Sequence, residues 1–138
     1  MPDSVLLDTS AALWVMGGEP MSDASRKAIR AAGATNLGIY VSPFTAWEIG
    51  TLVAKKRLPL ALSPEVWFEA LLAQPGVRLA PLTPSILIAS TALPGTPPAD
   101  PADRIIAATA RALGHILITR DAKLLDYAHQ GHIRAIAC

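Results

Sequence analysis

The sequence predicts an α/β fold in which a mostly parallel sheet is covered by helices on both faces. Two observations support this expectation. The chain has 138 residues, the size of one ordinary domain, so residues 1–138 are expected to form a single unit. Short apolar runs alternate along it with segments whose apolar residues recur every three or four positions. Strands that alternate with helices are joined by helical crossovers, which make neighbouring strands parallel.

Five short runs rich in Val, Ile and Leu are expected to be the strands. They are SVLLD at 4–8, GIYV at 38–41, VRLAPL at 77–82, HILIT at 115–119 and IRAIA at 133–137. Segments with helical spacing lie at 11–16, 22–32, 42–56, 63–74, 83–93, 100–113 and 121–128. Ser42 and Ser63 each precede a proline, and this pair marks a helix start because the serine caps the first turn and the proline needs no amide partner there.

Composition argues against a membrane or secreted protein. Apolar residues make up 51% of the chain, but no unbroken apolar run approaches the roughly 18 residues that a membrane span needs. The N-terminal residues MPDSV carry an acid where a secretory signal would have basic residues. The single cysteine, Cys138, cannot form a disulfide within the chain and fits a reducing compartment. We therefore expect a cytoplasmic protein with no membrane association.

Two aspartates follow predicted strands. Asp8 ends the first apolar run, in LLDTSAAL, and Asp121 comes just after the fourth, in HILITRDAKLL. In an open α/β sheet, ligands bind outside the carboxyl ends of the strands. If these two strands are neighbours in the sheet, the two carboxylates converge at that edge.

Two further acids lie on the apolar faces of predicted helices. Glu48 shares the stripe of Thr45 and Ile49, and Asp103 is in register with Ile106. A carboxylate directed toward a core is costly without a cation partner. Four converging carboxylates would repel one another until protons or a metal neutralised them, so these acids predict a site for Mg²⁺ or Mn²⁺.

Helix capping is the competing explanation for most of these acids. Asp8 and Asp121 each precede a helical segment, and Asp100 precedes Pro101 in DPAD, which would make Asp103 the third residue of a capping-box-like turn. Glu48 has the weakest explanation of this kind. His129 and His132 have the spacing of one helical face, and we expect them at the surface rather than at a metal.

Four motifs in order resemble the acidic motifs of the PIN domain family, and more closely those of the VapC toxins of bacterial toxin–antitoxin pairs. They are LLDTSAALW, SPFTAWEIG, DPADRIIAATA and LITRDAKLL. The resemblance covers essentially the whole chain and implies a three-layer α/β/α fold with a five-stranded parallel sheet. It also implies a metal-dependent endoribonuclease whose catalytic and metal-binding acids are Asp8, Glu48, Asp103 and Asp121. It places supporting hydroxyls at Thr9 or Ser10 and at Thr119, with Asp100 as a cap or a support to the site.

The same resemblance implies an RNA substrate, a homodimer and a cognate antitoxin that blocks the acidic site. Apart from the four candidate acids, twelve Lys and Arg face seven Asp and Glu, so the scaffold is mildly basic around an acidic centre. We expect Arg104, Arg120 and Lys123, beside the motifs, to contact RNA phosphates.

Apolar side chains outside the acidic motifs are candidates for contacts with a partner. The segment 63–74 is apolar around so much of its circumference that Trp67 or Phe68 should face another chain or another part of this one. Trp14 and Met16 belong either to a groove for the antitoxin or to the core.

Two other interpretations compete. A receiver-like or haloacid-dehalogenase-like phosphotransfer domain also has an aspartate after its first strand, but neither accounts for Glu48 inside a helix, and Ser10 stands where the latter needs a second acid. A catalytically silent PIN-like module that binds RNA or protein would not need the complete set of acids.

Overall fold

The computed structural model describes residues 3–138, which form five strands and seven helices. The strands are β1 (Val5–Leu7), β2 (Ile39–Val41), β3 (Val77–Leu79), β4 (Ile116–Thr119) and β5 (Arg134–Ala137). The helices are α1 (Thr9–Gly17), α2 (Asp23–Gly33), α3 (Pro43–Ala54), α4 (Pro64–Leu72), α5 (Pro84–Ser90), α6 (Pro101–Leu113) and α7 (Ala122–His129). Each expected strand and helix is therefore present.

All five strands pair in parallel, in the order β3-β2-β1-β4-β5. The central strand β1 pairs with β2 on one side, where Leu6 faces Tyr40, and with β4 on the other, where Leu6 faces Leu117. The expectation that the first and fourth strands are neighbours is confirmed. The chain leaves β1 in one direction across the sheet and later returns to its other side, so the carboxyl end of β1 is a switch point of the kind where ligands bind.

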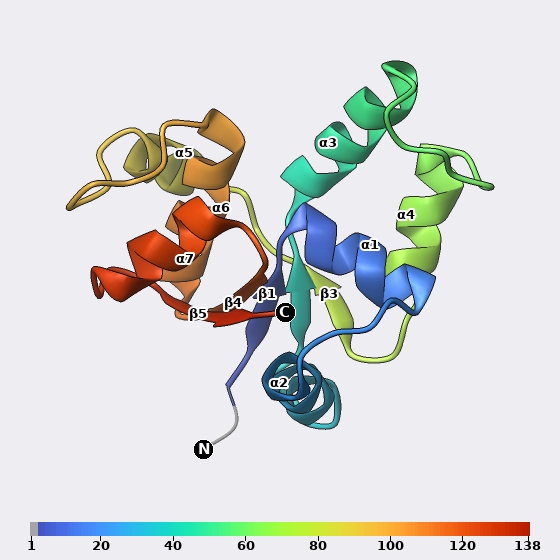
Figure 1. Ribbon diagram of the computed structural model, residues 1–138, viewed down its shortest axis with the longest axis horizontal. Helices are drawn as coiled ribbons and strands as arrows, with labels where there is room; N and C mark the ends of the chain where they lie inside the picture. Colours follow the sequence, from blue (N-terminus) through green and yellow to red (C-terminus); the bar gives the residue numbers. More distant parts are fainter. Residues whose placement is uncertain (1–2) are drawn as a thin grey trace.

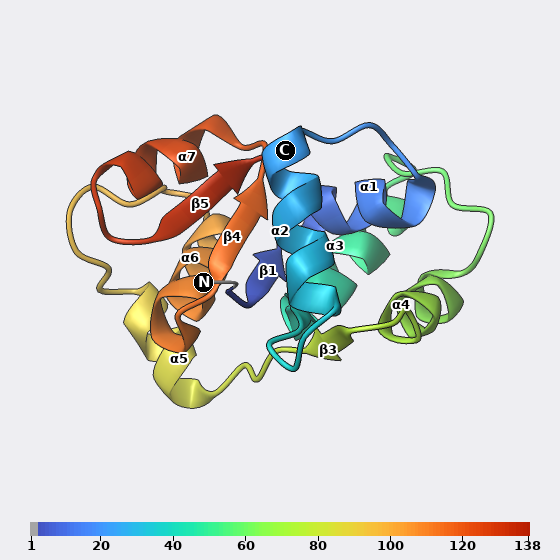
Figure 2. The ribbon, with the colours of Figure 1, turned by 90° about the horizontal axis from the view of Figure 1, so that it is seen from below.

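Successive side chains of a strand point to opposite faces of the sheet, so the interior is divided into two cores. Val5 and Leu7 of β1 contact one core, which α1 to α4 complete, whereas Leu6 contacts the other, which α5, α6 and α7 complete. Figure 1 shows α1, α3 and α4 on one side of β1 and α5 to α7 on the other, and Figure 2 shows α2 crossing in front of the sheet. The fold is the expected three-layer α/β/α arrangement.

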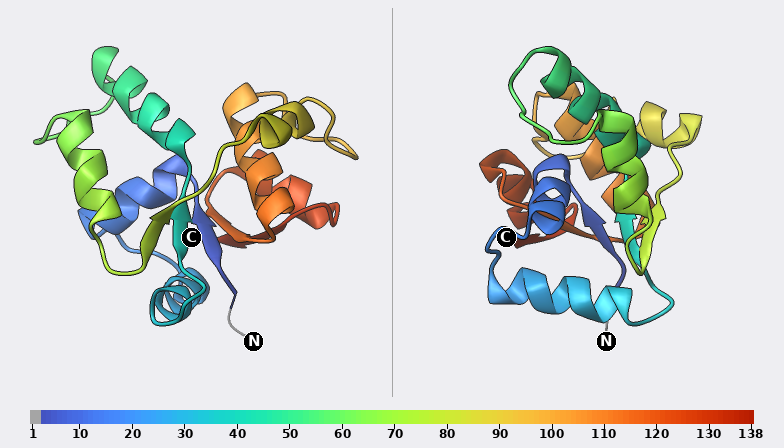
Figure 3. Two further views of the ribbon diagram at one scale, coloured as in Figure 1. Left: turned by 180° about the vertical axis from the view of Figure 1, so that it is seen from behind. Right: turned by 90° about the vertical axis from the view of Figure 1, so that its right-hand side faces the viewer.

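The helix starts follow from their capping residues. Ser42, Ser63 and Thr83 cap α3, α4 and α5, each directly before a proline. Helix α5 is shorter than the expected segment 83–93. It ends at Ser90 because the chain turns at Thr91 and enters a proline-rich connection. Seen from behind, α3 and the α5–α6 pair rise on opposite sides of the sheet's upper edge (Figure 3).

The aromatic residues of α4 pack within this chain. Trp67 is buried in the core on the α1–α4 side, and Phe68 packs against that core while remaining half-buried. Of the two expectations for this helix, the contact with another part of the same chain is the one observed. No helix in the described part of the chain is long and apolar enough to cross a membrane.

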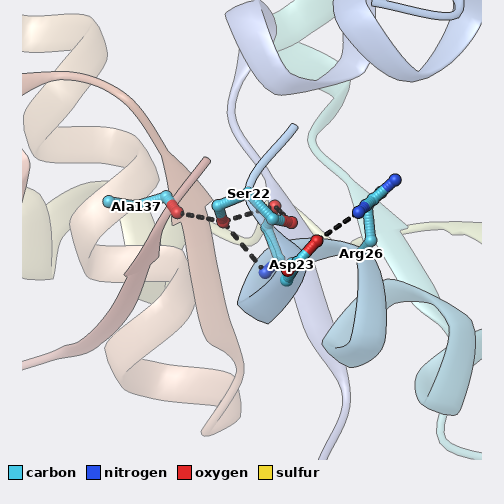
Figure 4. A network of polar contacts seen from close by, with 5 residues as sticks. Ser22, Asp23, Arg26 and Ala137 are labelled. Carbon is cyan, nitrogen blue, oxygen red and sulfur yellow. Dashed lines mark hydrogen bonds and ion pairs between the residues drawn. The ribbon is translucent and has the colours of Figure 1, made fainter. Parts of the chain in front are cut away.

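The edge strand β5 is fastened to the start of α2. The Ser22 hydroxyl, which caps α2, donates to the carbonyl oxygen of Ala137 at 2.7 Å, and Asp23 pairs with Arg26 one turn along the helix (Figure 4). The hydrogen bond from Ser22 to Ala137 joins the last strand to the helix layer that covers β1. It therefore holds the C-terminal segment beside the carboxyl edge of the sheet.

Candidate active site

Asp8 is a helix cap and a buried acid at the carboxyl edge of the sheet. Its Oδ1 accepts a hydrogen bond from the amide of Ala11 at 2.7 Å, which caps α1, and its Oδ2 accepts from the hydroxyl of Thr119. The side chain lies where β1 ends, and the residue is only 8% exposed. The cap occupies one oxygen of Asp8 and leaves the other bonded to the neighbouring strand β4, so capping α1 does not prevent this carboxylate from lining the carboxyl edge of the sheet.

Asp121 reaches the same edge from β4. Its Oδ2 accepts from the amide of Leu124 at 2.9 Å and caps α7, while its own amide donates to the Thr119 hydroxyl oxygen at 3.0 Å. Thr119 thus bonds to Asp8 through its hydroxyl hydrogen and to the backbone of Asp121 through its oxygen. Thr119 therefore bridges the two acidic segments.

Glu48 enters from α3, on the face that the sequence predicts. Thr45 and Ile49, its neighbours on that stripe, are fully buried, and Glu48 itself is half-buried. The hydroxyl of Thr9 donates to Glu48 Oε1 at 2.7 Å and lies 3.2 Å from the Thr45 hydroxyl. This contact separates Thr9 from Ser10: Thr9 orients Glu48, whereas Ser10 is exposed and lines the same recess.

The structure separates the two aspartates of DPAD. Asp100 is exposed and caps α6, because its Oδ2 accepts from the amide of Asp103 at 3.0 Å. Asp103, in the first turn of α6, is half-buried and lines the recess together with Ile106. Asp103 is therefore the acid that faces the other three, and Asp100 is the cap that sets its position.

These side chains line one open recess with a volume of about 100 Å³. Its lining residues are Asp8, Thr9, Ser10, Glu48, Asp103, Ile106 and Asp121. Three helices, α1, α6 and α7, begin beside it, each capped by an aspartate. Helix N-termini carry partial positive charge, which lowers the cost of gathering acids there without cancelling it.

Burial and mutual repulsion raise the pKa values of three of the acids. Burial is the largest cause for Asp8 and for Glu48, whose pKa values both lie above their usual range. For Asp103, burial and then repulsion from Asp121, Asp100, Glu48 and Asp8 raise the pKa from 3.8 to about 7. Raised carboxyl pKa values that cluster in a recess are typical of functional sites.

Comparisons with known proteins identify the family. A family model for the PIN domain matches residues 5–130. The chain belongs to the PIN domain family. It is 35% identical over 128 residues to Ribonuclease VapC22 of Mycobacterium tuberculosis, in an alignment covering 91% of this chain and 93% of that protein. It is also similar to a chain in the crystal structure of VapBC2 from Rickettsia felis bound to a DNA fragment from their promoter, with a TM-score of 0.69, 14% identity and coverage of 97% and 98%.

Membership in the PIN domain family confirms the resemblance drawn from the four acidic motifs. It also excludes the receiver-like and haloacid-dehalogenase-like interpretations, which leave Glu48 without a role. The family model spans residues 5–130, a range that contains all four motif segments rather than one strand-and-aspartate pattern.

The acids of this PIN domain suit a hydrated hard cation. Within residues 3–138, no group of three or more His, Cys, Asp or Glu side chains forms a ready-made metal site. The donors are nevertheless all carboxylate and hydroxyl oxygens around an open recess, and Mg²⁺ commonly keeps several waters while binding through one or two carboxylates. The residues present therefore fit an ion held partly through water. His129 and His132 do not line the recess, as expected.

The arginines predicted to bind RNA are engaged by the backbone of this PIN domain. Arg104 donates to three carbonyl oxygens, and Arg120 donates to those of Cys138 at 2.8 Å and Pro20 at 3.3 Å. The Arg120 guanidinium also lies over the Trp14 ring, 3.4 Å from its centroid. These contacts do not support phosphate binding by either arginine, whereas Lys123 is exposed on α7.

The apolar side chains of α1 and α3 differ in burial. Met16 packs against the core on the α1–α4 side, and Trp14 is half-buried beneath Arg120. Trp47, next to Glu48 on α3, is 61% exposed and stacks on Phe44 with ring centroids 5.2 Å apart. Sequence reasoning missed Trp47. Its position one residue before Glu48, off the buried stripe, was the available signal.

Proposed function

We propose that this PIN domain is a metal-dependent endoribonuclease that acts as the toxin of a toxin–antitoxin pair. The observation that supports it best is the convergence of Asp8, Glu48, Asp103 and Asp121 on one recess at the carboxyl edge of β1 and β4. Ribonuclease VapC22, to which the chain is 35% identical, is named as a ribonuclease. The similar solved structure is that of VapBC2 bound to a DNA fragment. Residues 1–138 act as one catalytic domain, and the compartment is the cytoplasm.

The residues of the recess have two kinds of proposed role: some bind the metal ion, and others orient the attacking water or a carboxylate. Asp8, Asp103 and Asp121 would hold Mg²⁺ or Mn²⁺, and Glu48 would either hold the ion with them or orient the attacking water. A divalent cation bound there would supply two things: activation of water and relief of negative charge on the phosphodiester. Thr9 fixes one oxygen of Glu48. No side-chain nucleophile is needed for this reaction.

Thr119 keeps Asp8 oriented toward the β4 side of the recess. Its hydroxyl donates to Oδ2 of Asp8, while the cap to Ala11 occupies Oδ1. Partners of this kind set the orientation of metal-binding carboxylates, and their loss typically reduces metal affinity or activity by 10- to 100-fold. Replacing Thr119 with Val should therefore weaken cleavage without removing any of the four acids.

The partners are an RNA substrate, a cognate antitoxin and a second copy of this chain. Lys123 and the other exposed basic residues supply the contacts to RNA phosphates. The exposed apolar residues Trp47 on α3 and Ile88 on α5, 61% and 68% exposed, provide surface that self-association would cover. Light scattering of the purified protein, with Trp47→Ser as the variant, tests the dimer: a monomeric wild type would contradict it.

The first experiment is cleavage of a total small-RNA pool by the purified, antitoxin-free protein. Reactions contain Mg²⁺, Mn²⁺ or EDTA. Asp8→Asn removes the charge but keeps an oxygen to cap Ala11, and Glu69→Gln removes an exposed acid of α4 as the matched control. We expect discrete fragments that require metal, disappear in Asp8→Asn and persist in Glu69→Gln.

The other outcomes are informative in different ways. Fragments that survive both EDTA and Asp8→Asn would contradict the metal-dependent mechanism. RNA binding without cleavage at any metal concentration, combined with full cellular effect of Asp8→Asn, would instead support a catalytically silent binding module.

A further inference from the structure

The connection between α5 and α6 is tied down along its length. We call residues 91–100 the strap. The Tyr127 hydroxyl donates to the carbonyl oxygen of Pro94 at 2.7 Å. Gln130 exchanges two hydrogen bonds with the backbone of Thr96, at 2.8 and 3.0 Å. Both anchors come from α7 and the turn after it, and they hold the middle of the strap.

Arg104 joins the two ends of the strap. Its Nε donates to the carbonyl oxygen of Ser90 at 2.9 Å, and its Nη2 donates to that of Thr91 at 3.4 Å. Its Nη1 donates to the carbonyl oxygen of Pro98 at 3.0 Å. One planar guanidinium therefore joins the end of α5 to a point two residues before the cap of α6. A lysine ammonium, which is a single point of donors, cannot span these carbonyls in the same way.

The end of the strap sets where Asp103 lies. Asp100 is the last residue of the strap, and its side chain and carbonyl accept from the amides of Asp103 and Arg104, both at 3.0 Å. The first turn of α6 therefore follows the position of Asp100. Asp103 sits in that turn among like-charged carboxylates that push it out of the recess, so its position depends on the backbone that carries it.

We propose that Arg104 is a positioning residue for the acidic recess: by clamping both ends of the strap, it fixes the start of α6 and holds Asp103 among the other acids. The expected effect on metal binding rests on the proposed function. The clamping of the strap by Arg104 does not depend on that function. It replaces the expected phosphate contact of Arg104 with an internal role.

The test compares Arg104→Met, Arg104→Lys and Arg111→Met. Arg111 is the matched control because it lies on the same helix and makes one hydrogen bond, to the carbonyl of His132, away from the strap. Three quantities are measured: amide hydrogen exchange of residues 96–104 without metal, Mn²⁺ affinity by electron paramagnetic resonance, and affinity for a labelled mixed-sequence RNA in EDTA at several salt concentrations.

We expect Arg104→Met to speed exchange of the Asp103 amide and to weaken Mn²⁺ binding by about 10-fold, the usual effect of losing a support to a metal site. RNA affinity and its salt dependence should not change. Arg104→Lys should resemble Arg104→Met, because charge alone does not restore the clamp, and Arg111→Met should resemble the wild type.

Two results would overturn the inference. One is unchanged amide exchange in Arg104→Met. The other is unchanged Mn²⁺ affinity together with weaker RNA binding and a salt slope reduced by about one, which is the signature of a lost phosphate contact. If the wild type neither binds Mn²⁺ nor cleaves RNA, the proposed function fails, and hydrogen exchange alone decides whether Arg104 clamps the strap.

Discussion

Replacing Asp103 by Asn is expected to stabilise the metal-free protein at pH 8. Burial and the neighbouring carboxylates raise the pKa of Asp103 from 3.8 to about 7. At about 1.4 kcal/mol per pH unit, the difference corresponds to at most about 4 kcal/mol of unfolding free energy. Because the side chain is half-exposed and screened by solvent, we expect a gain of about 1–2 kcal/mol.

The sign follows from proton binding. Between about pH 4 and pH 7 the folded protein holds a proton on Asp103 that the unfolded chain has released, so the wild type loses stability as the pH rises through this window. Asparagine has no such proton. The stabilisation should therefore be largest above pH 7 and small near pH 4, where the carboxyl is protonated in both states.

Urea unfolding in EDTA at pH 5 and pH 8 measures the effect. In a domain of this size, 1–2 kcal/mol corresponds to a rise of roughly 3–7 °C in Tm, so thermal melts provide a second readout. Glu69→Gln, an exposed acid on α4, should change the unfolding free energy by less than about 0.5 kcal/mol at both pH values.

Added Mg²⁺ should reverse the ranking, because a ligand that binds only the folded state stabilises the wild type and not the variant. A variant that melts below the wild type in EDTA at pH 8 would refute the reasoning. In that case Asp103 stabilises the first turn of α6 more than repulsion in the recess destabilises it.

Three other outcomes are expected. Asp8→Asn should abolish RNA cleavage with little change in Tm, whereas Asp8→Ala should also lower the unfolding free energy by about 1–2 kcal/mol, since it loses the cap of α1; equal melts for both variants would contradict the capping role. Gly95→Ala should destabilise by about 1–3 kcal/mol in urea, because Gly95 has φ +71° and an added Cβ would lie 2.5 Å from His132 Nε2. Glu48→Gln should stop cleavage while RNA binding in EDTA persists, and a loss of RNA binding in a filter assay would assign Glu48 a different role.

The positions of the acids were predictable where they follow from periodicity. The strand patterns and the rule for parallel sheets placed Asp8 and Asp121 at one edge, and the strand order confirms that β1 and β4 are neighbours. Helical spacing placed Glu48 on the stripe of Thr45 and Ile49, both of which are buried. The sequence also preferred Asp103 over Asp100, and Asp103 is the one that lines the recess.

Contacts made by the backbone were not predictable in the same way. Arg104 and Arg120 looked like surface cations beside the motifs, but their acceptors are carbonyl oxygens at the ends of helices and strands, which no residue pattern reveals. Capping and metal binding also looked like alternatives for Asp8, because sequence reasoning assigns one role to each carboxylate. The two oxygens of one carboxylate can serve different partners.

The bridge from Thr119 to Asp8 joins residues 111 positions apart in the chain. During synthesis, a nascent chain that already displays Asp8 and Glu48 still lacks β4 and both remaining acids. Pairing of β1 with β4 is a long-range contact of the kind that forms late and slowly. The recess is therefore absent from any ribosome-bound fragment that ends before Thr119, and termination before that residue yields products without an assembled site.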